Sequence, residues 1–259
     1  MVGFASAVGW GKTGGMRKLV CVLAVSLLAA RGQAQKSEGS LSNISFDQNR
    51  IEKAASASGR WSMYAADTVG EGANGFGAEL GWPDLTLGFV HGTSPTSDVG
   101  VKLELTYAFE GSTVDNKIGM GVRVPFRFNV SRSDKLSILF HLDPGIKLIT
   151  YTPLSFGLQA PIGVMFGFRP QPNLSLGFGL DVPLVFYITG FPSPLIFIGP
   201  QFGPTLEYHI EQNVIIGLNA RFGPLIYFWS DSDYQGFFIP GGSDTRFAFR
   251  LQFVVGYRM

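Results

Sequence analysis

The stretch from Leu154 to Phe168, LSFGLQAPIGVMFGF, decides the fold class, because apolar residues alternate with small or polar ones along its whole length. A period of two places the two sets on opposite faces of a β-strand. The apolar set is Leu154, Phe156, Leu158, Ala160, Ile162, Val164, Phe166 and Phe168. Strands of soluble domains usually run about 5–6 residues, whereas a strand that crosses a bilayer needs roughly 9–11. The stretch therefore predicts a membrane-spanning β-strand.

The composition excludes several other classes of protein. Of the 259 residues, 46% are hydrophobic, 34 are Gly and only 15% are charged. No run of about 20 apolar residues occurs beyond the N-terminus, which argues against membrane-spanning helices. Four of the 20 basic residues and none of the 19 acidic ones lie in residues 1–34, so the remainder is mildly acidic and we expect no nucleic-acid partner. The single cysteine, Cys21, lies in this same region.

The N-terminal region predicts export. Residues 16–34 combine a basic start at Arg17 and Lys18, an apolar core and small residues at Gly32 and Ala34, which is typical of a secretory signal peptide. We divide the chain into an N-terminal extension and signal peptide at 1–34, a flexible periplasmic segment at 35–59 and a barrel at 60–259. An alternative for 35–59 is a helix that folds into the barrel mouth.

The alternation seen at 154–168 recurs along the chain and predicts about ten strands, with eight or twelve as alternatives. The predicted strands are 60–68, 75–91, 99–109, 118–128, 136–148, 154–168, 174–186, 195–210, 213–229 and 246–259. The second one changes phase at Pro83 and Asp84. A bulge there would keep one strand, and the alternative is two short strands.

The lengths of the connections give the orientation. The links at 131–134, 170–173 and 211–213 are short, 230–244 is long, and 111–116 is intermediate. Transmembrane barrels have short periplasmic turns and longer outer loops. Ten strands place both ends of the barrel in the periplasm, so we predict an all-β, antiparallel, up-and-down transmembrane β-barrel.

The apolar face is predicted to contact lipid and the other face to line the lumen. In a soluble, lipocalin-like barrel the apolar face would instead enclose a ligand. The second face, however, is rich in Gly and poor in charge, which would make a poor water-facing surface. The apolar face lacks charged residues, as expected where an Arg or Lys costs about 2–4 kcal/mol at mid-depth.

Three strands share a pattern of glycine, polar residue and proline on the lumen side: residues 121–125, 157–161 and 179–183. Proline inside a paired strand removes a hydrogen-bond donor, so we interpret these prolines as bulges or kinks. With the signal peptide, the long strands and the terminal strand, the chain resembles the small outer-membrane β-barrel domain proteins of Gram-negative bacteria. This resemblance implies a cell outer-membrane location and insertion by the barrel assembly machinery. That machinery would recognise Tyr257 and Phe253, since the terminal residue Met259 is not aromatic.

Charged residues on the lumen face are the candidate functional residues. They are Lys102, Glu104, Arg123, Arg127, His141, Asp143, Lys147, Arg169, Asp181, Glu207, Arg221 and Arg250. Buried charges pair with one another because an unpaired one is costly, which predicts an internal network. The alternative is a narrow pore whose basic excess favours anions.

The functional prediction is an integral outer-membrane barrel that acts as a narrow passive pore for small polar solutes or ions. The alternative is a non-conducting structural or adhesive barrel that acts through its outer loops. An outer-membrane lipid- or peptide-hydrolysing enzyme ranks third, because Ser137 is too far along the strand from His141 to form a nucleophile pair with it. We therefore predict no enzyme activity, no cofactor or metal, a monomer, and outer-membrane lipid as partner.

Overall fold

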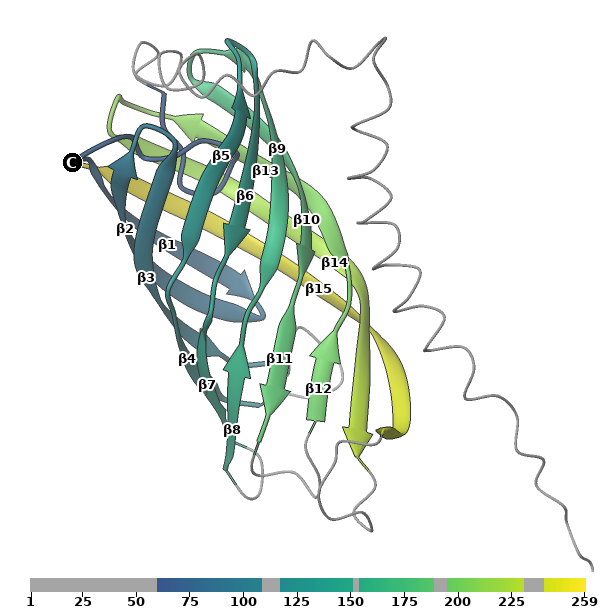
Figure 1. The fold of residues 1–259 in the computed structure, drawn as a ribbon. Helices are drawn as coiled ribbons and strands as arrows, with labels where there is room; N and C mark the ends of the chain where they lie inside the picture. Colours follow the sequence, from purple (N-terminus) through teal and green to yellow (C-terminus); the bar gives the residue numbers. More distant parts are fainter. Residues whose placement is uncertain (1–59, 109–116, 151–153, 189–194, 231–239) are drawn as a thin grey trace, which may run out of the picture. The chain divides into compact units, whose positions relative to one another are not determined.

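The computed structural model describes residues 60–108, 117–150, 154–188, 195–230 and 240–259. These residues form fifteen strands of one antiparallel sheet, which confirms the all-β, antiparallel prediction (Figure 1). In the described ranges no helix has the length and apolar character needed to cross a membrane. The strands are β1 (Asn74–Trp82), β2 (Asp84–Ser94), β3 (Ser97–Thr106), β4 (Gly119–Arg123), β5 (Phe126–Arg132), β6 (Leu136–Leu142), β7 (Gly145–Ile149), β8 (Ser155–Gln159), β9 (Ile162–Gln171), β10 (Leu174–Val182), β11 (Leu184–Tyr187), β12 (Leu195–Ile198), β13 (Gln201–His209), β14 (Val214–Ser230) and β15 (Pro240–Arg258).

The sheet closes on itself into a barrel. Its first strand, β1, pairs with its last, β15, from Gly75 opposite Arg258 to Trp82 opposite Leu251. Each of the fifteen described strands is hydrogen-bonded to a neighbour on both sides. Closure satisfies the backbone groups that an edge strand would leave unpaired.

The number of strands differs from the prediction of about ten. Five of the predicted long strands are each interrupted, which gives the successive pairs β4 and β5, β6 and β7, β8 and β9, β10 and β11, and β12 and β13. A proline lies at each interruption, at positions 125, 144, 161, 183 and 200. Proline has no backbone N–H to donate to the ladder, so the regular pairing stops there and resumes beyond it.

The prediction was wrong at the start of the barrel. Residues 60–70 form no strand; they enter the barrel, where Trp61, Ala66 and Val69 are at most 1% exposed. The predicted strand 75–91 is two strands, because Pro83 ends β1 and the chain turns back as β2, with Leu80 opposite Leu85. The alternative of two short strands is therefore correct.

The connections follow the expected lengths where they are described. Residues 133–135, 172–173 and 210–213 link β5 to β6, β9 to β10 and β13 to β14. The predicted link at 111–116 lies outside the described residues. The predicted loop 230–244 is shorter than expected, because β14 continues to Ser230 and β15 begins at Pro240, and residues 231–239 lie outside the described part.

Side chains alternate between the two faces of the wall. On β3, for example, Leu103 and Leu105 are 53% and 47% exposed, whereas Glu104 between them is 5% exposed. Inside, an apolar cluster of Trp61, Met63, Val69, Val90 and Ile215 lies toward the end with the short turns. A second apolar cluster at the other end includes Tyr187, Phe197 and Tyr227. Charged residues fill the space between them.

Candidate functional site

The charges at the centre of the lumen form a connected network, in which Glu104 on β3 is contacted by three side chains. It lies 3.0 Å from Lys147 Nζ and 3.0 Å from Arg123 Nη2, and it accepts a 2.7 Å hydrogen bond from Thr106 Oγ1. The register explains these contacts: Glu104 is opposite Gly121 on β4, and Gly121 is opposite Lys147 on β7. The glycine leaves room for the two longer side chains to meet across it.

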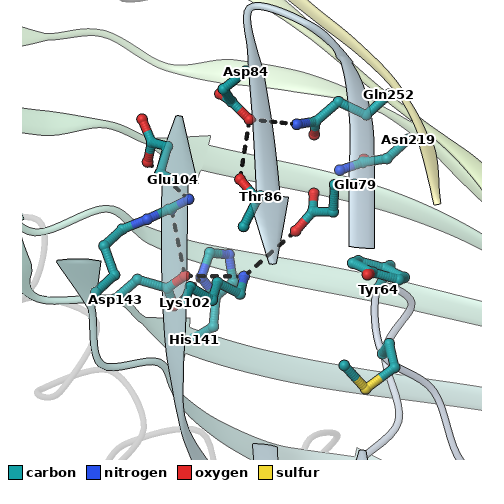
Figure 2. A network of polar contacts seen from close by, with 12 residues as sticks. Tyr64, Glu79, Asp84, Thr86, Lys102, Glu104, His141, Asp143, Asn219 and Gln252 are labelled. Carbon is teal, nitrogen blue, oxygen red and sulfur yellow. Dashed lines mark hydrogen bonds and ion pairs between the residues drawn. The ribbon is translucent and has the colours of Figure 1, made fainter. Parts of the chain in front are cut away.

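Asp143 connects this carboxylate to the next group. Lys102 Nζ lies 3.3 Å from Asp143 and 3.9 Å from Glu79, and Arg123 Nη1 lies 3.7 Å from Asp143 (Figure 2). The cations are thus shared between carboxylates on β1, β3 and the break between β6 and β7. Such shared pairing is what retains charges inside a protein, because an unpaired buried charge is expensive.

His141 on β6 joins the network to Asp181 on β10, across Gly163 of the strand between them. Its Nε2 lies 2.7 Å from Asp181 Oδ1, and its Nδ1 lies 3.4 Å from Asp143 Oδ1. Asp181 in turn accepts a 2.6 Å hydrogen bond from Arg221 Nε. Because both ring nitrogens face carboxylates, the ring acts here as a bridge between two acids.

A separate group of polar contacts centres on Asp84, just after the turn at Pro83. Asp84 accepts hydrogen bonds from Gln252 Nε2 at 2.6 Å and Thr86 Oγ1 at 3.1 Å (Figure 2). Arg250 Nη2 lies 3.3 Å from Asp84 Oδ2. Asp84 is 1% exposed. The turn places this acid in the lumen, opposite the last strand.

The remaining predicted residues, Arg127, Arg169 and Glu207, contact the inserted residues 60–70. Arg127 pairs with Asp98 and donates hydrogen bonds to the carbonyls of Ser62 and Met63. Arg169 donates to the carbonyl of Trp61, and Glu207 accepts hydrogen bonds from the backbone N–H groups of Met63, Tyr64 and Ala65. The structure thus places all twelve predicted residues at the inner face of the wall, some in the polar contacts of the lumen and others around the backbone of residues 60–70.

Sequence reasoning missed three acids of the wall that face the lumen, Glu79, Asp84 and Asp98. The prediction of a single strand through Pro83 hid Glu79 and Asp84, and Asp98 lies just before the predicted strand 99–109. Treating Pro83 as a turn would have restored the alternation on both sides and placed Glu79 and Thr86 on one face.

The cavity left at the centre is small. Its volume is about 110 Å³, and its walls include Tyr64, Lys102, His141, Asp181 and Arg250. That volume is well below the roughly 300–1,000 Å³ of typical small-molecule pockets. Within the described residues, no three His, Cys, Asp or Glu side chains are grouped so as to hold a metal ion.

No protein-family model and no curated protein matches the chain. Among solved structures, the outer membrane protease OmpT from Escherichia coli matches with a TM-score of 0.38 and 7% identity, over 72% of this chain and 93% of that one. Because the matched protein is a protease, our prediction that the chain is not an enzyme is overturned and withdrawn. A likeness at this level assigns no activity in its place.

Proposed function

We propose that the protein is an integral outer-membrane β-barrel whose lumen is closed, rather than an open pore. The membrane location is supported by the outer surface: each of the fifteen strands carries at least one large apolar side chain that is more than a third exposed. Water-soluble monomers rarely expose apolar patches larger than a few hundred Å². A surrounding band of this kind fits a lipid environment.

The main support for a closed lumen is that side chains and an inserted segment fill the interior of the barrel. Residues 60–70, the ion-pair network and the aromatic cluster follow one another inside the barrel. The cations and carboxylates of the network face one another at 3.0–3.9 Å instead of facing an open channel. This arrangement favours the non-conducting alternative over the anion pore that the basic residues suggested.

The proposal includes an orientation and partners. The end with turns 133–135, 172–173 and 210–213 is placed in the periplasm, since periplasmic turns are the short ones. Outer-membrane lipid contacts the apolar band. The barrel assembly machinery recognises β15, on which Phe253 and Tyr257 face outward, each 46% exposed. A monomer is favoured because the described sheet is closed, and an adhesive role would rest on loops that are largely outside the described residues.

The test is conductance of the refolded full-length protein in a planar bilayer, with insertion checked independently. We expect no stable current steps from the parent protein. Arg123→Ala removes a cation that faces Glu104 and Asp143, and we expect it to introduce cation-preferring leaks through the charge that it uncovers. Stable open steps in the parent protein, with an ion preference that Arg123→Ala changes, would contradict the proposal and support a pore.

A further inference from the structure

Residues 60–70 are held in the lumen by contacts to their backbone. Three backbone N–H groups, those of Met63, Tyr64 and Ala65, donate to a single oxygen, Oε1 of Glu207, at 3.2, 2.7 and 3.2 Å. A fourth, the N–H of Val69, lies 3.2 Å from both carboxylate oxygens of Asp98. Two acids of the wall, Glu207 and Asp98, therefore accept hydrogen bonds from N–H groups that a strand would instead pair with a neighbouring strand.

The carbonyl groups of the same segment are bound by basic and amide side chains. Arg127 donates to the carbonyls of Met63 at 2.6 Å and Ser62 at 3.0 Å, and Asn129 donates to that of Ala66 at 2.9 Å. Arg169 and Arg132 donate to the carbonyls of Trp61 and Arg60, at 3.3 and 3.2 Å. Every buried backbone polar group needs such a partner, and here the wall supplies them from β3, β5, β9 and β13.

The wall is also shaped around the segment by glycines. A methyl group added at Gly75 would lie 2.6 Å from Met63 Sδ and 2.9 Å from Val69 Cγ1. One at Gly167 would lie 2.6 Å from Ser137 Oγ of the wall and 2.8 Å from Ala66 Cβ, and one at Gly256 would lie 2.7 Å from Ile215 Cγ1 of the wall and 3.0 Å from Met63 Cγ. All three positions are on the lumen side, so the segment occupies the space that ordinary side chains would take.

We propose that this half of the lumen is a peptide-binding site in which residues 60–70 are the resident ligand. The ligand class is an irregular polypeptide of similar length, with small side chains at the positions of Ala65 and Ala66. Recognition through the backbone is largely independent of sequence, as in other modes in which main-chain hydrogen bonds provide affinity. The site therefore binds a polypeptide supplied from outside once the resident segment is free to leave.

A route to the site exists at the short-turn end. A cavity of about 860 Å³ opens there, lined by Arg60, Trp61, Arg169 and His209 among others. Arg60 and Trp61 begin the segment, so the cavity meets the bound chain at its first residues. An incoming peptide would displace the segment from this end. The inference goes beyond the proposed function and does not depend on whether the barrel conducts.

The experiment uses the full-length barrel with a specific protease site inserted after Glu71, which is exposed in the turn before β1. After cleavage the segment is held only by non-covalent contacts. A fluorescent synthetic peptide of residues 60–70 is added, and binding is followed by fluorescence anisotropy. We expect binding to the cleaved barrel, competition by unlabelled peptide, and much weaker binding to the uncleaved barrel.

Matched variants separate a specific site from adsorption. Gly75→Ala pushes first against Met63 and Val69 of the segment, whereas Gly88→Ala meets only Lys102 Cγ at 3.6 Å and the carbonyl of Gly77 at 4.0 Å. We expect Gly75→Ala to weaken peptide binding and Gly88→Ala to leave it unchanged. Glu207→Ala removes a charged acceptor for three N–H groups and should weaken binding by roughly 10- to 100-fold.

Two results would overturn the inference. The first is a cleaved barrel that keeps its own segment and takes up no labelled peptide, which would make the segment a fixed part of the core. The second is equal binding to cleaved barrel, uncleaved barrel and all three variants, which would indicate adsorption. Circular dichroism of each sample confirms that the β-sheet is intact. A sheet that unfolds on release of the segment also counts against an exchangeable ligand.

Discussion

Glu104→Gln is the sharpest test of the ion-pair network. The substitution keeps the shape of the side chain and removes one negative charge that lies 3.0 Å from both Lys147 and Arg123. The amide also places an N–H donor beside one of the cations. We expect the variant to fold into the same barrel and to unfold at a lower urea concentration.

The size of the loss follows from the burial of the pair. Two opposite charges about 4 Å apart attract by roughly 4 kcal/mol at an effective dielectric constant of about 20. Breaking a buried ion pair from one side costs about 3–5 kcal/mol, because the remaining charge stays buried. Since the Glu104 side chain is only 3% exposed, we expect a loss of about 4 kcal/mol in the free energy of unfolding.

The assay is urea unfolding of the barrel in lipid vesicles, followed by tryptophan fluorescence. The control is Asp244→Asn, whose carboxylate pairs with Arg246 at 3.1 Å but is 50% exposed. An exposed pair contributes about 0–1 kcal/mol. Adding Lys147→Met to Glu104→Gln restores the balance of charge and should recover part of the loss, as measured by a double-mutant cycle. Equal losses for Glu104→Gln and Asp244→Asn would refute the argument.

Three further substitutions test other parts of the barrel. Leu103→Arg places a charge on the outer face and should cost about 2–4 kcal/mol in vesicles if that position is near mid-membrane; unchanged stability there would place Leu103 outside the lipid. Phe197→Ala empties the aromatic cluster, in which its ring centre lies 4.6 Å from that of Tyr227, and should cost about 3–5 kcal/mol by thermal or urea unfolding. Gly81→Ala brings a methyl group onto the carbonyl of Leu251. It should separate β1 from β15, which faster hydrogen exchange at that seam would report and native exchange rates would contradict.

The strands of the wall were predictable because the residue type at each position depends on which side of the wall that position faces. A side chain in a barrel wall faces either lipid or lumen, so the alternation of Leu103, Glu104 and Leu105 appears directly in the sequence. Pairs within the network were not predictable in the same way. Glu104 meets Lys147 because three strands align at Gly121, and this register depends on turns and interruptions far from either residue.

The inserted segment shows why local pattern is insufficient. Trp61, Met63 and Ala65 alternate with Ser62 and Tyr64, which imitates a short strand. What prevents pairing is the wall, where Glu207 takes three N–H groups from a position more than 140 residues away. The local alternation of residues therefore does not distinguish a strand from a segment whose backbone groups are bound by distant side chains.

The prolines connect the interruptions of the strands with the position of the ion-pair network. Backbone hydrogen bonds link neighbouring breaks: Val124 donates to the carbonyl of Pro144, Asp143 to that of Pro161 and Ala160 to that of Leu184. The breaks therefore lie side by side around the barrel. At three of them, the repeated pattern places a polar residue two positions before the proline.

In this way the pattern of glycine, polar residue and proline sets the position of Arg123, Gln159 and Asp181 in the lumen. The glycine leaves space for a neighbouring side chain, as Gly179 does for Arg221. The proline ends the regular ladder just beyond the polar residue. A pattern that argues against long regular strands is thus the part of the sequence that brings Arg123 and Asp181 to the central network.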